Sequence, residues 1–557
     1  MASMITTGRM PVPLVLTLLA VASLHAGSRS IVVLATTDLH GNLYPVDYFT
    51  GQQASRGLAK VATLIKAERA RQPNIILIDC GDTIQGTPLE YVYQKSSPLH
   101  EDPMMLAMNR IGYDAMTVGN HEFNFGLKNL HRARSNALFP WLSANIKPEP
   151  GSKAQAFGSY LLKTVDGVKV AVIGITTPAV PTWEKPENYA GYRFEGGVEA
   201  VRKTVTSLAR EHPDLVVVAA HAGLGEGTPD DENMVRAISA VPGIDAIVFG
   251  HTHQELAEQR LGGVLLTQPK NWGMSIARLV FTLEGEPGKP WRVAAKRSSL
   301  VKVTDQTPAD PEILEIAKPF HAAAERYLST EVARSSVPLD GVLGRVGDSA
   351  LVEAIHEVQL QYARAEVSFA SLFNPGVSVP AGSVTVRQIA SLYIYENELF
   401  AIEGDGRMVK EALENAARFF VSCVGEACGK GPLTNRNVLG FNYDMAQGVS
   451  YEIDLSKPEG SRIVNLTFKG APLAPGRKLR IAINNYRAGG SAGYSMFRGA
   501  KVVWRSAEDI RQLMIDYFTE RGKLPDKADG NWRILPELAR KTLERDARAE
   551  AARSGLF

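Results

Sequence analysis

Seven side chains that can bind a metal ion follow short apolar runs in the first half of the chain. They are carboxylates, an amide and imidazoles, in the order Asp38, His40, Asp82, Asn120, His221, His251 and His253. The set contains no thiolate, so zinc, manganese or iron suits it better than calcium, which prefers oxygen ligands alone. Seven ligands are too many for one tetrahedral ion but fit two ions that share a carboxylate. Two such ions can activate a water molecule and hold the oxygens of a phosphate ester, so the predicted chemistry is phosphate ester hydrolysis.

The apolar runs that precede these side chains have the composition of buried strands. They are apolar without alternation, and helical stretches at 57–69 and 198–211 lie between them, which predicts a layered α/β domain. Ligand sites in such sheets lie beyond the carboxyl ends of the strands, so the polar clusters should converge on one crevice. The runs are at 31–35, 75–78, 115–118, 168–175, 215–220, 246–249 and 264–267.

Each of these polar residues also has a simpler explanation when it is considered alone. An Asp or Asn after a strand can cap the next turn, and a single His can be a hydrogen-bonded core residue. Taken together they favour metal binding, because several acids and imidazoles buried at one sheet edge would be costly without cations.

The chain of 557 residues is expected to fold as two main domains. A helical stretch at about 311–333 and a turn-rich segment after it mark the boundary. The second domain mixes helices (348–364 and 409–422) with strands (451–455 and 479–484), which predicts an α+β unit. The expected divisions are a signal peptide at 1–26, a metal-binding domain at 29–305, a connecting helix and linker at 306–339, a second domain at 340–520 and a tail at 521–557.

The terminal segments carry different predictions. Arg9 precedes an apolar run at 12–22 that is long enough for the core of a signal peptide but too short to span a bilayer. Small residues at 20–22 and Ala26 offer cleavage sites, so we expect a secreted or periplasmic protein; an uncleaved membrane anchor is the alternative. No later run approaches membrane length, so the mature chain should have no stable membrane span. The charged stretch at 537–553 is interpreted as a solvated helix or a frayed tail.

Composition limits the partners. Lys and Arg total 61 against 59 Asp and Glu, and a formal charge of +2 creates no broad field for a polyanion. Nucleic-acid polymers are therefore poor candidates, and we expect a monomer that acts on a small molecule. Cys423 and Cys428 lie close together in a Gly-containing loop and favour a disulfide over a metal site, because no His is near them. Cys80 is expected to be an inert core residue.

The order of the polar motifs resembles that of the calcineurin-like metallophosphoesterases. The motifs are Asp-x-His-Gly from Asp38, Gly-Asp-x-x-x-Gly from Gly81, Gly-Asn-His-Glu from Gly119, the isolated His221 and Gly-His-x-His from Gly250. From about residue 31 to 498 the chain resembles the branch that contains secreted 5′-nucleotidases and 2′,3′-cyclic-nucleotide phosphodiesterases. The resemblance implies an α-β-β-α metallophosphoesterase domain joined by a helix to a smaller α+β substrate-binding domain.

The resemblance also implies how the ligands divide between two metal ions. One ion takes Asp38, His40 and His253, the other takes Asn120, His221 and His251, and Asp82 bridges them. Imidazole at position 253, where 5′-nucleotidases can have Gln, favours zinc or manganese. A hydroxide that bridges the ions would then attack phosphorus, with Asn120 also contacting the substrate.

His121 is implied to act on the transition state. It would offset charge on the phosphoryl oxygens or protonate the leaving alkoxide; hydrogen bonding to a ligand is the alternative role. Many relatives have Asp where this chain has Asn124. An amide can orient an imidazole but cannot stabilise its cation, so His121 should be less readily protonated here. On that view, Asn124→Asp should shift the basic limb of the pH–rate profile upward.

The second domain contains segments that resemble those holding a nucleobase between two rings. Here the rings would be Phe441 and Tyr486, with core packing as the alternative. Asn374 of the family's phosphate-binding segment is present, but the Arg of the 5′-nucleotidases is not, which favours 2′,3′-cyclic and 3′-nucleotides as substrates. Hydrolysis of 5′-nucleotides, UDP-sugars or sulfur esters remains an alternative, as does a non-catalytic secreted nucleotide-binding protein.

Overall fold

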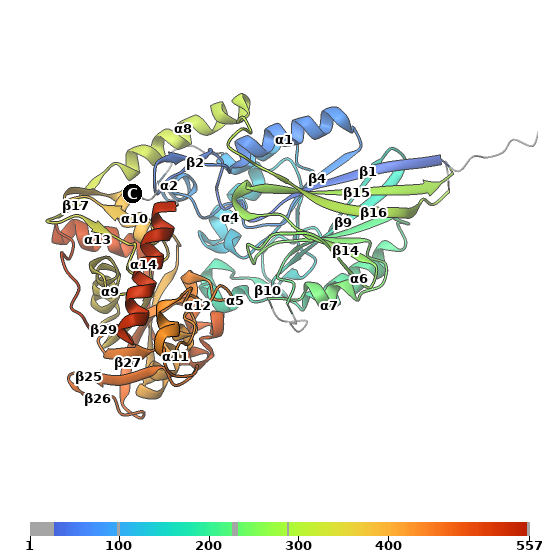
Figure 1. Cartoon of the computed structure of the whole chain (residues 1–557). Helices are drawn as coiled ribbons and strands as arrows, with labels where there is room; N and C mark the ends of the chain where they lie inside the picture. Colours follow the sequence, from blue (N-terminus) through green and yellow to red (C-terminus); the bar gives the residue numbers. More distant parts are fainter. Residues whose placement is uncertain (1–26, 97–100, 226–231, 287–288, 554–557) are drawn as a thin grey trace, which may run out of the picture.

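The structure of the protein is a computed structural model that describes residues 27–96, 101–225, 232–286 and 289–553. The expected signal peptide at 1–26 lies outside the described residues. Within these ranges, no helix combines the length and the apolar character needed to cross a bilayer. Figure 1 shows two lobes, with helix α8 (Pro311–Leu328) running along the top from the first lobe to the second.

Two six-stranded sheets pack face to face in the first domain, and their strands include every one predicted there. Side chains such as Val33 and Ile78 from one sheet and Val172 and Val217 from the other form the core between them. The first sheet has the order β16 (Arg292–Lys302), β15 (Ser275–Gly285), β1 (Gly27–Thr36), β4 (Ile75–Asp79), β5 (Ala115–Thr117) and β6 (Trp141–Leu142). The second has the order β13 (Leu256–Leu261), β14 (Val264–Gln268), β12 (Ala246–Phe249), β11 (Leu215–His221), β9 (Val168–Thr176) and β8 (Tyr160–Val165).

Helices cover the outer faces of both sheets, which confirms the α-β-β-α layering. On the first sheet, α1 (Leu58–Arg71) and α3 (Pro103–Ile111) share a core with Val32 and Leu34. On the second sheet, α6 (Gly197–Leu208) and α7 (Val235–Ser239) pack on residues of β9 and β11. Helices α2 (Pro88–Ser96), α4 (Gly126–Asn136) and α5 (Val180–Trp183) lie in the connections after strands.

Helix α8 begins after a capping residue, Asp310, and ends at Leu328. The Asp310 side chain accepts hydrogen bonds from the backbone of Glu312 and Ile313, and Pro311 occupies the first helical position. The prediction that the helix continues to about residue 333 is wrong. Residues Glu331–Ser335 form β17, which pairs antiparallel with β21 (Gly382–Thr385) and buries Val332, so strand pairing outweighs helix propensity there.

The second domain is the predicted α+β unit. Helices α9 (Ala350–Ala363), α11 (Gly406–Ala417) and α13 (Ile510–Arg521) pack around its sheets. Helix α11 ends before the predicted residue 422, because the chain turns to pair Val421 N with Leu433 O. The larger sheet has the order β23 (Asp444–Gln447), β19 (Val367–Ser371), β27 (Lys478–Asn484), β22 (Glu398–Asp405) and β28 (Val502–Asp509), and the smaller has β26 (Ala471–Pro472), β25 (Ile463–Phe468), β24 (Ser450–Asp454) and β29 (Trp532–Leu535).

The last part of the chain belongs to the second domain, so the prediction of a tail from residue 521 is wrong. Strand β29 pairs parallel with β24 and buries Trp532 and Ile534. Helix α14 (Glu537–Arg553) follows and buries Leu543 among the residues of the core. The helix predicted at 537–553 is thus confirmed, and three of its charged residues, Glu537, Lys541 and Arg548, are exposed.

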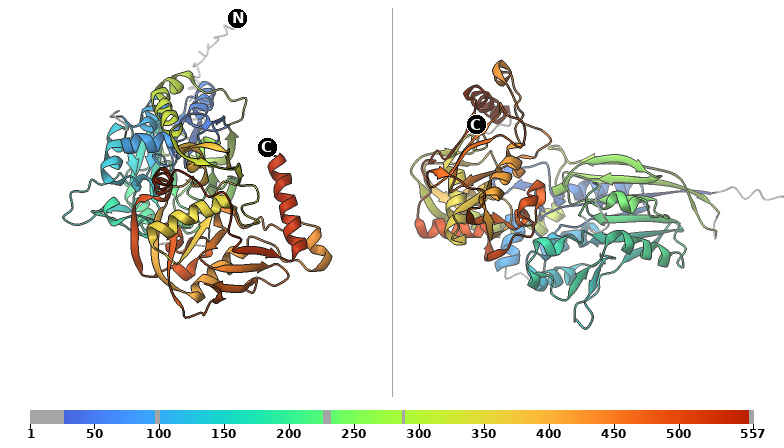
Figure 2. Two further views of the ribbon diagram at one scale, coloured as in Figure 1. Left: turned by 90° about the vertical axis from the view of Figure 1, so that its left-hand side faces the viewer. Right: turned by 90° about the horizontal axis from the view of Figure 1, so that it is seen from below.

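The predicted disulfide between Cys423 and Cys428 is present, with an S–S distance of 2.16 Å. Its loop lies next to α14 at the edge of the second domain, and Cys80 is a buried free thiol in the first domain. The right-hand view of Figure 2 shows the two domains side by side.

Candidate metal centre

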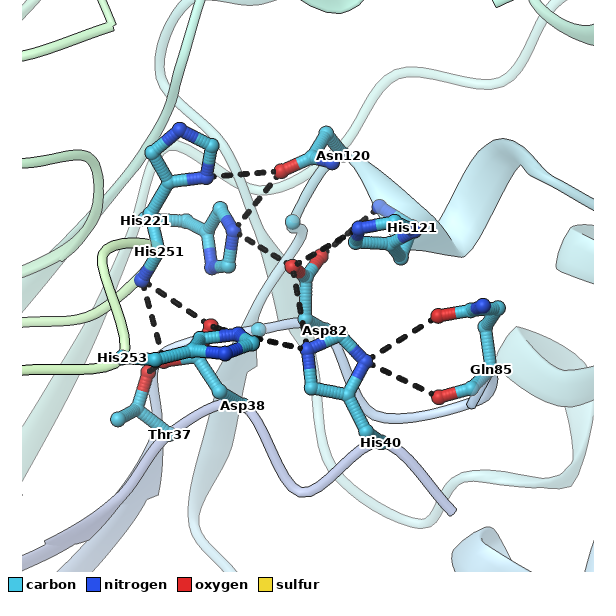
Figure 3. A network of polar contacts seen from close by, with 12 residues as sticks. Thr37, Asp38, His40, Asp82, Gln85, Asn120, His121, His221, His251 and His253 are labelled. Carbon is cyan, nitrogen blue, oxygen red and sulfur yellow. Dashed lines mark hydrogen bonds and ion pairs between the residues drawn. The ribbon is translucent and has the colours of Figure 1, made fainter. Parts of the chain in front are cut away.

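The structure brings all seven predicted ligands together at the carboxyl ends of strands from both sheets (Figure 3). Two groups of side chains each place their potential ligand atoms within 4.8 Å of one another: Asp38, His40 and His253, and Asp82, His221 and His251. Asn120 completes the second group, because its Oδ1 lies 3.0 Å from His221 Nε2 and 3.1 Å from His251 Nδ1.

Asp82 lies between the two groups (Figure 3). Its Oδ2 is 2.9 Å from His221 Nε2 and 3.9 Å from His40 Nε2. On the far side of His40, the Nε2 atoms of His40 and His253 are 3.0 Å apart, and His253 Nε2 is 3.4 Å from Asp38 Oδ1. One carboxylate therefore reaches both groups, as a bridging ligand must.

The loops that carry these side chains have an unusual backbone conformation. Asp38, His40, Asp82, His251 and His253 all have positive φ, between 47° and 72°. Such conformations are uncommon outside glycine and cost on the order of 1–3 kcal/mol each unless the surroundings enforce them. Backbone hydrogen bonds between neighbouring loops enforce them here: Asp38 N donates to Gly81 O at 2.9 Å and His40 N to Asp82 O at 2.8 Å. The fold thus concentrates backbone strain where the ligands lie.

Glu122 holds two of the loops together, a role that the sequence analysis did not assign. Its buried carboxylate accepts backbone hydrogen bonds from Gly119 at 2.6 Å, Asp82 at 2.9 Å and Thr83 at 2.6 Å. The loops approach so closely that a Cβ at Gly119 would lie 2.2 Å from Asp82 Oδ1. Glu122 is the last residue of the Gly-Asn-His-Glu motif but is not a ligand, and its place in that motif is the one sequence feature that could have indicated this role.

The charges of the centre suit cations. Burial would raise the pKa values of Asp38 and Asp82, but neighbouring imidazoles outweigh it and hold both pKa values well below their usual range. Burial and His253 lower the pKa of His40 to about 3, so its ring is neutral. Burial would lower the pKa of His221, but Asp82 raises it to about 10, so a bound ion would have to displace a proton there. Ionised carboxylates and neutral imidazole are metal-binding forms, and the donor set fits divalent ions.

His121 lies beside the ligands without belonging to either group. Its Nε2 is 4.0 Å from Asp82 Oδ2, and its backbone N donates to Asp82 Oδ1 at 2.8 Å. The ring is held at both nitrogens: Nδ1 is 2.6 Å from Asn124 Oδ1, and Nε2 is 3.0 Å from the Tyr486 hydroxyl of the second domain. Asn124 therefore orients the imidazole, as an amide at this position should.

Comparisons with known proteins agree with this arrangement. Residues 31–255 match the family model of the calcineurin-like phosphoesterases, and residues 331–499 match that of the 5′-nucleotidase C-terminal domain. A 2′,3′-cyclic-nucleotide 2′-phosphodiesterase/3′-nucleotidase from Salmonella typhimurium is 30% identical over 598 residues, which cover 94% of this chain and 91% of that protein. The chain belongs to this metallophosphoesterase family. It is accordingly a metal-dependent phosphoester hydrolase.

One further relative is much longer than this metallophosphoesterase, and one solved structure matches it along most of its length. The trifunctional nucleotide phosphoesterase YfkN of Bacillus subtilis is 30% identical over 568 residues, but the match covers 90% of this chain and only 39% of YfkN. A solved structure of a Staphylococcus aureus protein assigned as a 5′-nucleotidase, in complex with α-ketoglutarate, has a TM-score of 0.77 at 27% identity and covers 91% of this chain and 100% of that chain. The two-domain fold expected from the motifs is therefore confirmed.

In this metallophosphoesterase, Asn124 is hydrogen-bonded to a buried carboxylate, that of Glu184, which no sequence motif indicated. Asn124 Nδ2 donates a hydrogen bond to Glu184 Oε1, and Asn188 Nδ2 donates to Glu184 Oε2 at 2.9 Å. Burial raises the pKa of Glu184 to about 7. The prediction that an amide, Asn124, orients His121 is therefore incomplete, because a carboxylate is hydrogen-bonded to that amide in turn. Glu184 lies 60 positions along the chain in a loop without a recognisable motif, so no local pattern pointed to it.

His40 has a similar support that crosses to the second domain. Its Nδ1 is 3.1 Å from the backbone oxygen and 3.2 Å from the side-chain Oε1 of Gln85. Gln85 Nε2 then donates to Glu396 Oε2 at 2.8 Å, and Glu396 forms a buried ion pair with Arg511 at 2.5 Å. No sequence motif indicated these three residues either.

A pocket of about 360 Å³ lies between the domains next to the metal centre. His121 and His251 border it from the first domain, and the predicted rings Phe441 and Tyr486 border it from the second. Phe441 is 39% exposed, whereas the ring of Tyr486 stacks on Trp183 with centroids 5.6 Å apart. The structure thus places both rings at one pocket, with one face of Tyr486 against Trp183.

Asn374, the other predicted substrate contact, borders an adjoining cavity of about 240 Å³ that shares His121 and His253 with the larger pocket. This cavity also touches His40 at the edge of the metal centre. The Oδ1 of Asn374 accepts a hydrogen bond from Gly376 N at 3.0 Å.

Proposed function

We propose that this metallophosphoesterase hydrolyses 2′,3′-cyclic nucleotides and 3′-nucleotides with two divalent ions, zinc or manganese. The two groups of mixed ligands that meet at Asp82 carry the proposal. The substrate class is supported by the similarity to the Salmonella typhimurium enzyme along nearly the whole chain. In the proposed assignment, one ion is held by Asp38, His40 and His253, the other by Asn120, His221 and His251, and both by Asp82.

The ions would supply an activated water and neutralise charge on the phosphoryl group. The chain's own residues would orient the ester. The amide of Asn120 lies beside the second group and is placed to contact a phosphoryl oxygen. His121 presents Nε2 towards the pocket, because Asn124 holds its other nitrogen. From there it can protonate the leaving alkoxide or offset charge on the phosphoryl oxygens.

The second domain would present the nucleobase. The exposed ring of Phe441 offers one stacking surface at the pocket. Stacking on an aromatic ring stabilises a bound base by ~1–3 kcal/mol and tolerates different bases. Tyr486 would supply the second ring and Asn374 a polar contact. We therefore expect Phe441→Ala to raise KM for nucleotides while leaving p-nitrophenyl phosphate hydrolysis unchanged.

The substrate assignment is tested by an assay of the metal-loaded protein on 2′,3′-cyclic AMP, 3′-AMP, AMP and a UDP-sugar. We expect the highest kcat/KM for the first two, and loss of all activity after chelation. The matched control is His121→Ala with its metal content measured, which should keep both ions and lose turnover. Absence of hydrolysis with two ions bound would support a nucleotide-binding protein instead.

Hydrolysis of 5′-nucleotides is the second candidate. The match of residues 331–499 to the 5′-nucleotidase C-terminal domain and the likeness to the Staphylococcus aureus structure favour it. A higher kcat/KM for AMP than for 3′-AMP would select this candidate.

The remaining proposals concern where and in what state the enzyme acts. The signal-peptide pattern at 1–26 supports export, and the part of the chain that the structure describes has no helix able to span a bilayer. We propose an exported monomer. Recovery of the mature N-terminus from the periplasm or medium, and light scattering of the purified protein, test these two statements.

A further inference from the structure

We propose that Glu184 is a positioning residue that fixes the tautomer and orientation of His121 through the side chain of Asn124. The three side chains form an unbroken hydrogen-bonded chain. Glu184 Oε1 accepts from Asn124 Nδ2, and Asn124 Oδ1 is 2.6 Å from His121 Nδ1. The inference rests on the role proposed above for His121 in hydrolysis.

The carboxylate of Glu184 determines which group donates and which accepts in both hydrogen bonds. Above its pKa of about 7, Glu184 is mainly ionised, and an ionised carboxylate can accept hydrogen bonds but cannot donate them. The amide nitrogens of Asn124 and Asn188 donate to its two oxygens. Asn124 must therefore turn its NH₂ group towards Glu184 and its oxygen towards His121. That oxygen can only accept, so the hydrogen of a neutral His121 ring lies on Nδ1.

The consequence appears at the other nitrogen of the ring. With the hydrogen on Nδ1, Nε2 carries a lone pair and faces the pocket, where the Tyr486 hydroxyl lies 3.0 Å away. Protonation of this lone pair gives the imidazolium that, in the role proposed above, protonates the leaving alkoxide or offsets charge on the phosphoryl oxygens. If the amide of Asn124 flipped, its NH₂ group would face Nδ1, and the hydrogen of the ring would move to Nε2. Glu184 prevents this flip.

The surroundings keep Glu184 in place. Its side chain is buried, and its backbone N donates to Val180 O at 3.0 Å as the chain leaves α5. Asn188, which holds the second oxygen of Glu184, also donates to the backbone oxygen of Asn124 at 3.4 Å. Glu184 therefore lies in a loop that is itself hydrogen-bonded, through Asn188, to the backbone of Asn124.

The first test measures whether Glu184 acts through His121. We expect Glu184→Ala to lower kcat by about 10- to 100-fold with little change in KM, the range for loss of an outer hydrogen-bond partner. Glu184→Gln should be impaired less than Glu184→Ala, because its amide oxygen can accept from Asn124 but, unlike a carboxylate, its amide does not fix which way Asn124 turns. In a His121→Ala background, Glu184→Ala should lower kcat no further. Glu187→Ala, an exposed glutamate in the same loop, is the control and should match wild type.

Two results would overturn the inference. One is an unchanged kcat in Glu184→Ala while His121→Ala is strongly impaired; the other is an equal further loss in the His121→Ala background, which would make Glu184 merely structural. If His121→Ala itself hydrolyses nucleotides at the wild-type rate, the role proposed for His121 fails instead. Melting temperature and metal content are measured for every variant so that folding defects are recognised.

The second test exchanges the carboxylate and the amide. Asn124→Asp alone would place two carboxylates in hydrogen-bond contact, and these repel each other when both are ionised, so activity is compared above pH 8, beyond the pKa of about 7 of Glu184. We therefore expect Asn124→Asp to lower kcat by about tenfold, and Asn124→Asp/Glu184→Gln to recover to within about threefold of wild type, since neighbouring residues that share a network couple strongly. A fully active Asn124→Asp, or a double variant no better than Asn124→Asp, would contradict the inference.

Discussion

Two histidines at the metal centre are each supported by a carboxylate through an amide, but the two supports lie in different parts of the molecule. His121, Asn124 and Glu184 all belong to the first domain. His40 and Gln85 belong to the first domain, whereas Glu396 and its partner Arg511 belong to the second. The first support forms when one domain folds. The second requires the arrangement of the two domains seen in Figure 1.

Polar contacts across the domain boundary include two ion pairs. Lys95 pairs with Glu508 at 2.8 Å, and Lys185 pairs with Glu398 at 2.9 Å. The first pair is largely exposed, so it stabilises weakly and is screened by salt, whereas the second is mostly buried. The comparison indicates that the support of His121 Nδ1 is complete within the first domain, whereas the support of His40 Nδ1 reaches the second domain. The Tyr486 hydroxyl of the second domain contacts only the other nitrogen of His121.

The largest expected effects distinguish the two histidines themselves. His121→Ala should lower kcat by on the order of 10²–10⁴-fold, the usual contribution of a positioned acid or base, while both ions remain bound. His40→Ala should lower activity at least as much and also release one of the ions, because it removes a proposed ligand. Metal content from mass spectrometry, read beside kcat, separates the two outcomes. Loss of metal from His121→Ala would place His121 among the ligands and undo the comparison.

A stability measurement tests the carboxylate of the first support. Burial raises the folded-state pKa of Glu184 to about 7, above its unfolded value. The folded state thus binds more protons than the unfolded state between about pH 4 and pH 7, so this group's contribution to stability falls as pH rises through that window. In chelator-treated protein, Glu184→Gln should gain about 2–3 kcal/mol in unfolding free energy relative to wild type between pH 5 and pH 8. The exposed Glu187→Gln should show no such gain, and a pH-independent difference for Glu184→Gln would mean that Glu184 is not buried as an acid.

The sequence was sufficient for features that depend on local patterns. Apolar runs located strands such as β4 and β11, and the motifs at their ends located the ligands, because a buried strand and the loop after it are contiguous in the chain. Features that depend on distant pairing were missed. Strand β29 was interpreted as part of a tail because its pairing with β24 is not visible in its own composition.

The supports of the histidines show the same limit. Glu184 lies 60 positions from Asn124, and Glu396 lies 311 positions from Gln85. Each is a single polar residue that acquires its role only when the chain folds, so no motif contains it. Glu122 is the intermediate case, since it lies inside a recognised motif but acts by binding backbone groups of another loop.

The smallest effect should come from the support that crosses the domains. In Gln85→Leu, His40 Nδ1 keeps the backbone oxygen of residue 85 at 3.1 Å as an acceptor, so the ring loses only one of its two partners. We expect the affinity for the more weakly held ion to fall by about 10-fold, the low end for loss of an outer partner of a ligand. Competition with a chelator measures this affinity.

Glu396→Gln is the matched variant from the other domain. It keeps an acceptor for Arg511 but removes the charge from a buried ion pair, so it should weaken metal binding less than Gln85→Leu. If Gln85→Leu weakens metal binding and Glu396→Gln leaves metal affinity unchanged, Gln85 supports His40 without help from the second domain. The two histidine supports would then be equivalent, because each would be complete within the first domain. Weaker metal binding in both variants would instead tie the ligand His40 to the position of the second domain.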